Sequence, residues 1–117
     1  MKIGEVCLET SDVIRLAGFY RWLLGIGGEN TDPVHQTLIG EETMLTVYND
    51  GTAKGNNNRN ISLAFTVDDI CTWHKRLAER GVRILTEPAA RPWGAVNMSF
   101  LDPDNNLVWL REFRQAE

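Results

Sequence analysis

Two carboxylates and a thiol alternate along the first segment of the sequence. Glu5, Cys7 and Glu9 are spaced by two residues, and side chains two residues apart on a β-strand project to the same face. Carboxylates on one face can act as a general base, ligate a cation or bind a basic ligand. Arg111, near the other end of the chain, is their natural counter-charge. A satisfied Glu–Arg pair and a site for a basic ligand therefore both stay open as interpretations.

Further polar and aromatic side chains fall on the same face of other expected strands or on a loop that follows one of them. Aromatic and aliphatic surface with a few polar groups is the usual lining of a small-molecule pocket. An alternative is that Trp109 and Tyr48 simply fill a packed core. Glu5 is the best candidate for a catalytic group, although no catalytic set is complete. The candidate ligand-binding residues are Glu5, Cys7, Glu9, Thr46, Tyr48, Ser62, Trp93, Trp109 and Arg111.

A repeat must position these residues. Residues 5–12 recur in altered form at 62–69, and self-similarity at a fixed offset indicates a duplicated supersecondary unit that buries its apolar face against a copy. The polar run at 51–60 is rich in glycine and asparagine, as linkers are. We therefore expect a single domain over 1–117, built from a module at 1–50 and a module at 61–114 joined by the linker 51–60.

Each copy begins with a strand, continues through an aspartate into an amphipathic helix, and reaches a glycine. Ser11 or Asp12 can cap the first helix and Gly25 can end it, while Asp69 and Gly81 have the same places in the second copy. Alternating segments after each helix predict further strands, so each half is expected to be a βαβββ unit. The predicted fold class is α+β, with two βαβββ modules forming a cupped mixed sheet and helices on its outer face.

Four short motifs carry a family resemblance across nearly the whole chain. They are Phe19-Tyr20-x-x-Leu23-Leu24-Gly25, Phe65-x-Val67-x-Asp69, Arg91-Pro92-Trp93-Gly94 and Asp102-Pro103-Asp104-x-Asn106-Leu107. In this order and spacing, after the first strand-aspartate-helix start, the chain resembles the glyoxalase / bleomycin resistance / extradiol dioxygenase superfamily, the vicinal oxygen chelate proteins. The resemblance implies paired βαβββ modules and a homodimer with two cavities.

The resemblance also implies four metal-ligating positions, one on each of four strands. In this sequence they fall on Glu5, Thr46, Ser62 and Trp109. Divalent transition metals prefer imidazole, carboxylate or thiolate donors. Only Glu5 qualifies, since hydroxyls are weak ligands and an indole N–H has no lone pair to give. We therefore expect no metal site and no metal cofactor.

Composition narrows the possible partners. The formal net charge is −4 and the basic residues are scattered, which argues against nucleic acid as the main partner. No apolar run is long enough to span a bilayer, and two cysteines are too few for a disulfide framework, so a cytoplasmic protein with no membrane partner is expected.

Three functions follow as hypotheses from these features. The favoured one is a metal-free binding protein that holds an amphipathic small molecule in a cavity associated with a homodimer. A divergent metal-dependent lyase or isomerase, acting on a substrate with vicinal oxygens through Glu5, is the alternative. A third possibility is that side chains fill the concave face of the sheet completely, so that no ligand cavity remains and the function is limited to dimer formation or partner binding.

Overall fold

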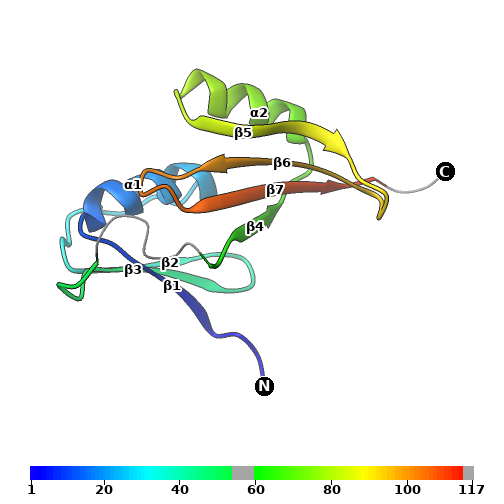
Figure 1. Cartoon of the computed structure of the whole chain (residues 1–117). Helices are drawn as coiled ribbons and strands as arrows, with labels where there is room; N and C mark the ends of the chain where they lie inside the picture. Colours follow the sequence, from blue (N-terminus) through cyan, green and yellow to red (C-terminus); the bar gives the residue numbers. More distant parts are fainter. Residues whose placement is uncertain (54–59, 115–117) are drawn as a thin grey trace. The chain divides into compact units, whose positions relative to one another are not determined.

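The structure is a computed structural model that describes residues 1–53 and 60–114 of the chain (Figure 1). Its parts divide into two compact units, Met1–Asn58 and Arg59–Glu117. The first unit contains β1 (Glu5–Glu9), α1 (Val13–Leu24), β2 (His35–Ile39) and β3 (Met44–Tyr48). The second contains β4 (Leu63–Thr66), α2 (Ile70–Glu79), β5 (Arg83–Ala90), β6 (Ala95–Leu101) and β7 (Leu107–Phe113).

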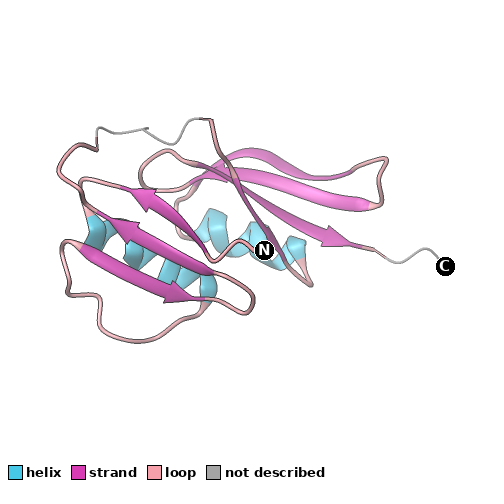
Figure 2. Cartoon of the chain, turned by 90° about the horizontal axis from the view of Figure 1, so that it is seen from below, coloured by secondary structure: helices cyan, strands magenta, loops and turns pink. Residues whose placement is uncertain are grey.

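The first unit is a three-stranded sheet with one helix on one face. The strand order is β1-β3-β2, with β1 parallel to β3 and β2 antiparallel to it. A parallel pair needs a crossover, which α1 supplies. The helix buries Leu16 and Tyr20, and the strands contribute Leu8, Leu38 and Val47, all of them nearly inaccessible to water. Figure 2 shows α1 behind this sheet, so that no helix of its own unit covers the opposite face, called here the uncovered face.

The second unit repeats this plan with one more strand. The order is β4-β7-β6-β5, with β4 parallel to β7 and the other pairs antiparallel. The helix α2 packs on β5, β6 and β7. Its Ile70 and Leu77 are fully buried, as are Met98, Phe100 and Val108 of the sheet. This sheet also has one face that no helix of its own unit covers.

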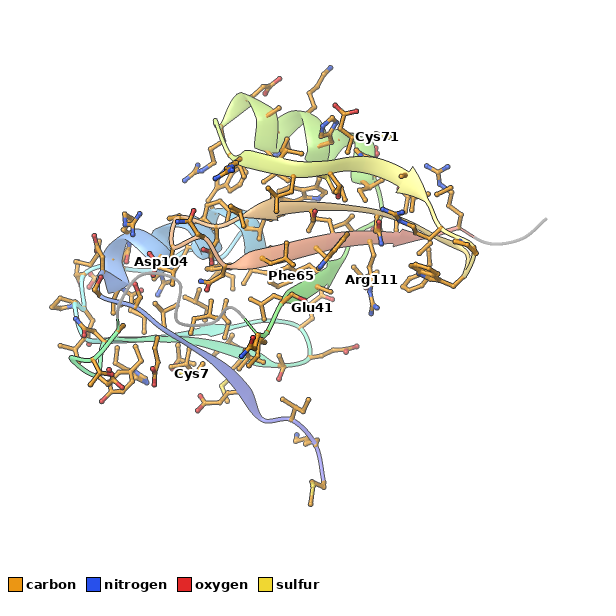
Figure 3. All side chains as sticks on the ribbon, viewed as in Figure 1. Cys7, Glu41, Phe65, Cys71, Asp104 and Arg111 are labelled. Carbon is orange, nitrogen blue, oxygen red and sulfur yellow. The ribbon has the colours of Figure 1, made fainter. Side chains whose placement is uncertain are left out.

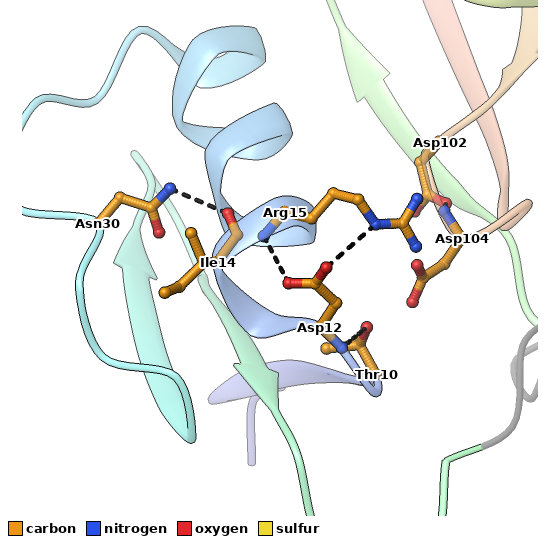
Figure 4. A network of polar contacts seen from close by, with 7 residues as sticks. All are labelled: Thr10, Asp12, Ile14, Arg15, Asn30, Asp102 and Asp104. Carbon is orange, nitrogen blue, oxygen red and sulfur yellow. Dashed lines mark hydrogen bonds and ion pairs between the residues drawn. The ribbon is translucent and has the colours of Figure 1, made fainter.

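Both helices begin at the predicted aspartates. Asp12 accepts a hydrogen bond from the backbone N–H of Arg15 at 3.1 Å, and Asp69 accepts one from that of Thr72 at 3.2 Å. Such caps satisfy N–H groups that have no partner within the helix. Figure 4 shows the first cap, where Asp12 also forms an ion pair with Arg15 and its own N–H is bound by the Thr10 hydroxyl. The prediction of helix starts at these residues is confirmed.

The turn between β6 and β7 is organised by one buried carboxylate. Asp102, which is 3% exposed, accepts hydrogen bonds from the backbone N–H groups of Asp104 and Asn106, both at 2.9 Å. Its second oxygen accepts from Nδ2 of Asn106 at 2.8 Å. Asn105 has a φ of 63°, the left-handed region that asparagine tolerates better than most residues. The motif at 102–107 therefore fixes how β6 pairs with β7.

The α+β fold class is confirmed, with one difference in the first unit. Within the described residues that unit has three strands and follows a βαββ order, and residues 26–34 form no strand. Side chains hold this segment: Arg21 donates to the carbonyl of Gly27 at 2.7 Å and to Oε1 of Gln36, while Nε2 of Gln36 donates to Oδ1 of Asn30 at 2.7 Å. These side-chain hydrogen bonds hold the segment in place of the backbone hydrogen bonds that a β-strand would form.

Two predictions are not tested by these features. Most of the expected linker at 51–60 lies outside the described residues, and the single-domain organisation stays a prediction.

No helix in the described ranges, 1–53 and 60–114, has the length and apolar character needed to span a membrane.

Candidate functional site

The uncovered face of the first unit carries the predicted alternating residues of β1. Glu5, Cys7 and Glu9 are paired in register with Met44, Thr46 and Tyr48 of β3. Leu8, between them in sequence, is buried on the helix side, so the alternation follows the predicted parity. Figure 3 shows Cys7 on the side of the sheet opposite α1.

The Thr46 hydroxyl is bound to Glu5. Its Oγ1 donates to Oε2 of Glu5 at 2.6 Å, and Thr46 is only 2% exposed. A buried hydroxyl without an acceptor would be unfavourable by about 1–3 kcal/mol, so the carboxylate has a structural role towards its neighbour. These two positions, implied by the resemblance to be metal ligands, satisfy each other.

Cys7 lies among negative charges. Partial burial, followed by the carboxylates of Glu5, Glu9 and Asp50, raises the pKa of the Cys7 thiol above its usual value. Because the thiolate is the nucleophilic form, this environment disfavours attack by Cys7 on an electrophile.

Tyr48 has an aromatic neighbour, His35, that is not among the binding residues predicted from the sequence. The imidazole of His35 contacts the Tyr48 ring edge-on, with ring centroids 5.7 Å apart. The two residues are register partners across β2 and β3. The signal that could have found His35 is the hairpin register, which places the first residue of β2 opposite the last residue of β3.

The uncovered face of the second unit is centred on β7. Trp109 is paired with Ala64 on one side and Ser99 on the other, and both neighbours are small. Trp109 itself is partly exposed. Arg111 has Thr66 and Asn97 in the corresponding positions. Trp109 and Arg111 thus share a face with uncharged neighbours.

Arg111 is held by contacts within its own unit. Its Nε donates to the Thr66 hydroxyl at 2.9 Å, and its guanidinium carbon lies 5.0 Å from the centre of the Phe113 ring, a cation–π contact. Figure 3 shows the side chain projecting from β7 on the side away from α2. The expected pairing of Arg111 with the glutamates of β1 stays a prediction.

The remaining two candidates lie outside the strands. Trp93, 67% exposed, is in the turn between β5 and β6, where Gly94 has a φ of 89°. Ser62 is exposed and precedes β4, which begins at Leu63 rather than at Ser62 as predicted. Its hydroxyl therefore does not belong to the regular face of that sheet.

The residues at the implied metal positions do not fit a metal ion. Thr46 and Ser62 carry neutral hydroxyls, Trp109 carries an N–H donor, and the one carboxylate, Glu5, is hydrogen-bonded to Thr46. Across residues 1–53 and 60–114, no three histidine, cysteine, aspartate or glutamate side chains gather closely enough to hold a metal ion. The donor set therefore lacks the chemistry that a transition metal requires.

A family comparison agrees with this fold and motif order. The model of the Glyoxalase/Bleomycin resistance protein/Dioxygenase superfamily matches residues 2–110. The chain belongs to this superfamily. A relative in Bacillus subtilis (strain 168), the uncharacterized protein YetH, is 33% identical over 118 residues, which cover 95% of this chain and 98% of the relative.

Solved structures of the superfamily share the fold. A glyoxalase/bleomycin resistance protein/dioxygenase from Nocardioides is 22% identical, with a TM-score of 0.77 over 100% of this chain and 86% of that one. A lactoylglutathione lyase from Agrobacterium tumefaciens is 20% identical, with a TM-score of 0.71 over 95% of this chain and 92% of that one. At these identities the likeness concerns the fold alone.

Proposed function

We propose that this superfamily member is a metal-free small-molecule-binding protein. It holds an amphipathic ligand in a cavity associated with a homodimer, and it acts in the cytoplasm. The observation that carries the proposal is the hydrogen bond from Thr46 to Glu5, at 2.6 Å, together with the indole of Trp109 at the fourth implied ligand position. Of the four implied ligand positions, Glu5 alone carries a coordinating group and is hydrogen-bonded to Thr46, while the fourth position carries a flat ring.

The two uncovered sheet faces support binding rather than metal chemistry. One presents Tyr48 and His35 in edge-on contact, and the other presents Trp109 beside small side chains. Flat, amphipathic rings contribute large contact areas at a low entropic cost. The raised pKa of Cys7 argues against a thiolate nucleophile on the first face.

Metal retention tests the first part of the proposal. The purified protein would be incubated with Ni²⁺ or Zn²⁺, passed through a desalting column and assayed by elemental analysis. We expect far less than one ion per chain. Stoichiometric retention that is lost in the variant Glu5→Gln would reject the metal-free proposal and favour the alternative, a metal-dependent lyase or isomerase.

Ligand binding tests the second part. Trp fluorescence would be recorded against a panel of aromatic amphiphiles for the wild type, Trp109→Phe and Trp73→Phe. Trp73 lies on α2 beneath the guanidinium of Arg76, 4.2 Å from its ring centre, and so is a matched control. We expect the ligand-dependent signal to fall in Trp109→Phe and to persist in Trp73→Phe. No response to any ligand would favour a packed cup without a cavity.

A further inference from the structure

Two arginines neighbour one asparagine in the second unit. Asn97 of β6 is the register partner of Arg111 on β7, so their side chains share a face and lie side by side. Arg91, in the turn after β5, reaches the same asparagine, because its Nε donates to Oδ1 of Asn97 at 2.9 Å. Arg91 and Arg111 are therefore both neighbours of one neutral amide on the same face, although Nε of Arg111 is bonded to Thr66 of β4, on the other side of β7.

Both guanidinium groups are oriented through Nε by neutral acceptors. Arg111 uses Nε for the Thr66 hydroxyl, and Arg91 uses it for the Asn97 amide oxygen. An arginine has five N–H donors in a planar fork, so the terminal nitrogens of both side chains remain for another partner. Among residues 60–114, neither arginine is in an ion pair with an aspartate or glutamate.

The backbone around Arg91 is fixed. Its N–H donates to the carbonyl of Ala95 at 2.7 Å, and its own carbonyl accepts from the N–H of Gly94 at 3.2 Å. Arg111 is in the middle of a paired strand and is further held against the ring of Phe113. Two preorganised cations on one face of the sheet, in a chain with a net charge of −4, offer charged hydrogen-bond donors to an anionic ligand.

We propose that Arg91 and Arg111 form the anion-binding part of the ligand site and that the ligand is a planar aromatic acid. The carboxylate accepts hydrogen bonds from the terminal nitrogens of the two arginines. The aromatic part lies against Trp109, two residues from Arg111 on the same face of β7. This inference rests on the proposed binding function and adds a ligand class and one residue, Arg91, to it.

A pair of probes that differ only in charge tests the proposal. Binding of 2-naphthoate and of its neutral analogue 2-naphthamide would be titrated by Trp fluorescence and by calorimetry. The proteins are the wild type, Arg91→Gln, Arg111→Gln and the control Lys75→Gln, which removes one exposed charge from α2 on the other side of the sheet. Circular dichroism would verify that each variant is folded.

We expect the wild type to bind naphthoate about 10-fold to 100-fold more tightly than naphthamide, the range for charge-assisted hydrogen bonds. Each arginine variant should lose most of this preference without a change in naphthamide affinity, and Lys75→Gln should keep it. The variant Arg111→Lys, which retains the charge but lacks the fork, should recover only part of the preference.

The outcomes separate this inference from the proposed function. Equal affinity of the wild type for the two probes would overturn the anion site while leaving the binding function intact. Loss of naphthoate binding in Lys75→Gln to the same extent as in the arginine variants would also overturn it, because only overall charge would matter. Failure of both probes to bind the wild type would overturn the inference and count against the binding function as well.

Discussion

Replacing Asp102 by asparagine tests whether one buried carboxylate holds the turn between β6 and β7. The carboxylate accepts three hydrogen bonds at 2.8–2.9 Å. In Asp102→Asn a single amide oxygen can still accept from the two backbone N–H groups, but without a charge. The new NH₂ group faces Nδ2 of Asn106, which is also a donor. The hydrogen bond between these two side chains is therefore lost.

The magnitude follows from these bonds. Hydrogen bonds to a charged group contribute about 1.5–3 kcal/mol each, so loss of one such bond and weakening of two others is the main cost. We expect Asp102→Asn to lower the free energy of unfolding by about 3 kcal/mol. A chain of 117 residues has about 6–18 kcal/mol of stability in total, so the variant should still fold.

Urea denaturation followed by circular dichroism is the assay. With a slope of about 1–3 kcal/mol per molar urea, the midpoint should fall by about 1–3 M. The control is Asp68→Asn, an exposed aspartate of the same unit, whose change should stay within about 0.5 kcal/mol. If Asp102→Asn moved the midpoint no more than this control does, the role assigned to the carboxylate would be refuted.

Three further predictions concern single side chains. The hydrogen bonds that Arg114 and the N–H of Ile70 donate lower the pKa of Glu112 from 4.5. The ionised carboxylate therefore stabilises the folded state above that pH, and this contribution is lost as the pH falls through the folded-state pKa. Glu112→Gln should therefore flatten the fall in stability below about pH 4.5, measured by urea denaturation at several pH values. At position 105, with its φ of 63°, alanine should cost about 1 kcal/mol and glycine little in thermal unfolding. In a Cys71→Ser background, Glu5→Gln should lower the pKa of Cys7 and speed its reaction with a disulfide reagent; an unchanged rate would contradict the charge effect.

The local features of the fold were predictable from the sequence because their causes are local. Alternation of Glu5, Cys7 and Glu9 with apolar residues fixes which face of β1 is buried, since side chains on a strand have a period of two. Asp12 and Asp69 mark helix starts because only a short acceptor side chain can bond N–H groups two or three residues later.

The side-chain networks could not be predicted in the same way. Gln36 is 5% exposed and accepts from Arg21, fifteen residues earlier, in place of an apolar residue on the inner face of β2. The bond from Arg91 to Asn97 likewise depends on a turn and an irregular register in β5. Such pairs leave no periodic trace, because they depend on three-dimensional placement rather than on spacing along the chain.

The pairing order within each unit has a consequence for synthesis. The first strand of each unit, β1 or β4, is hydrogen-bonded to the last strand of that unit, β3 or β7, rather than to its neighbour in sequence. During translation the early strand has no partner until the whole unit has emerged. A nascent chain halted within either half would expose a free strand edge, which invites aggregation and capture by chaperones.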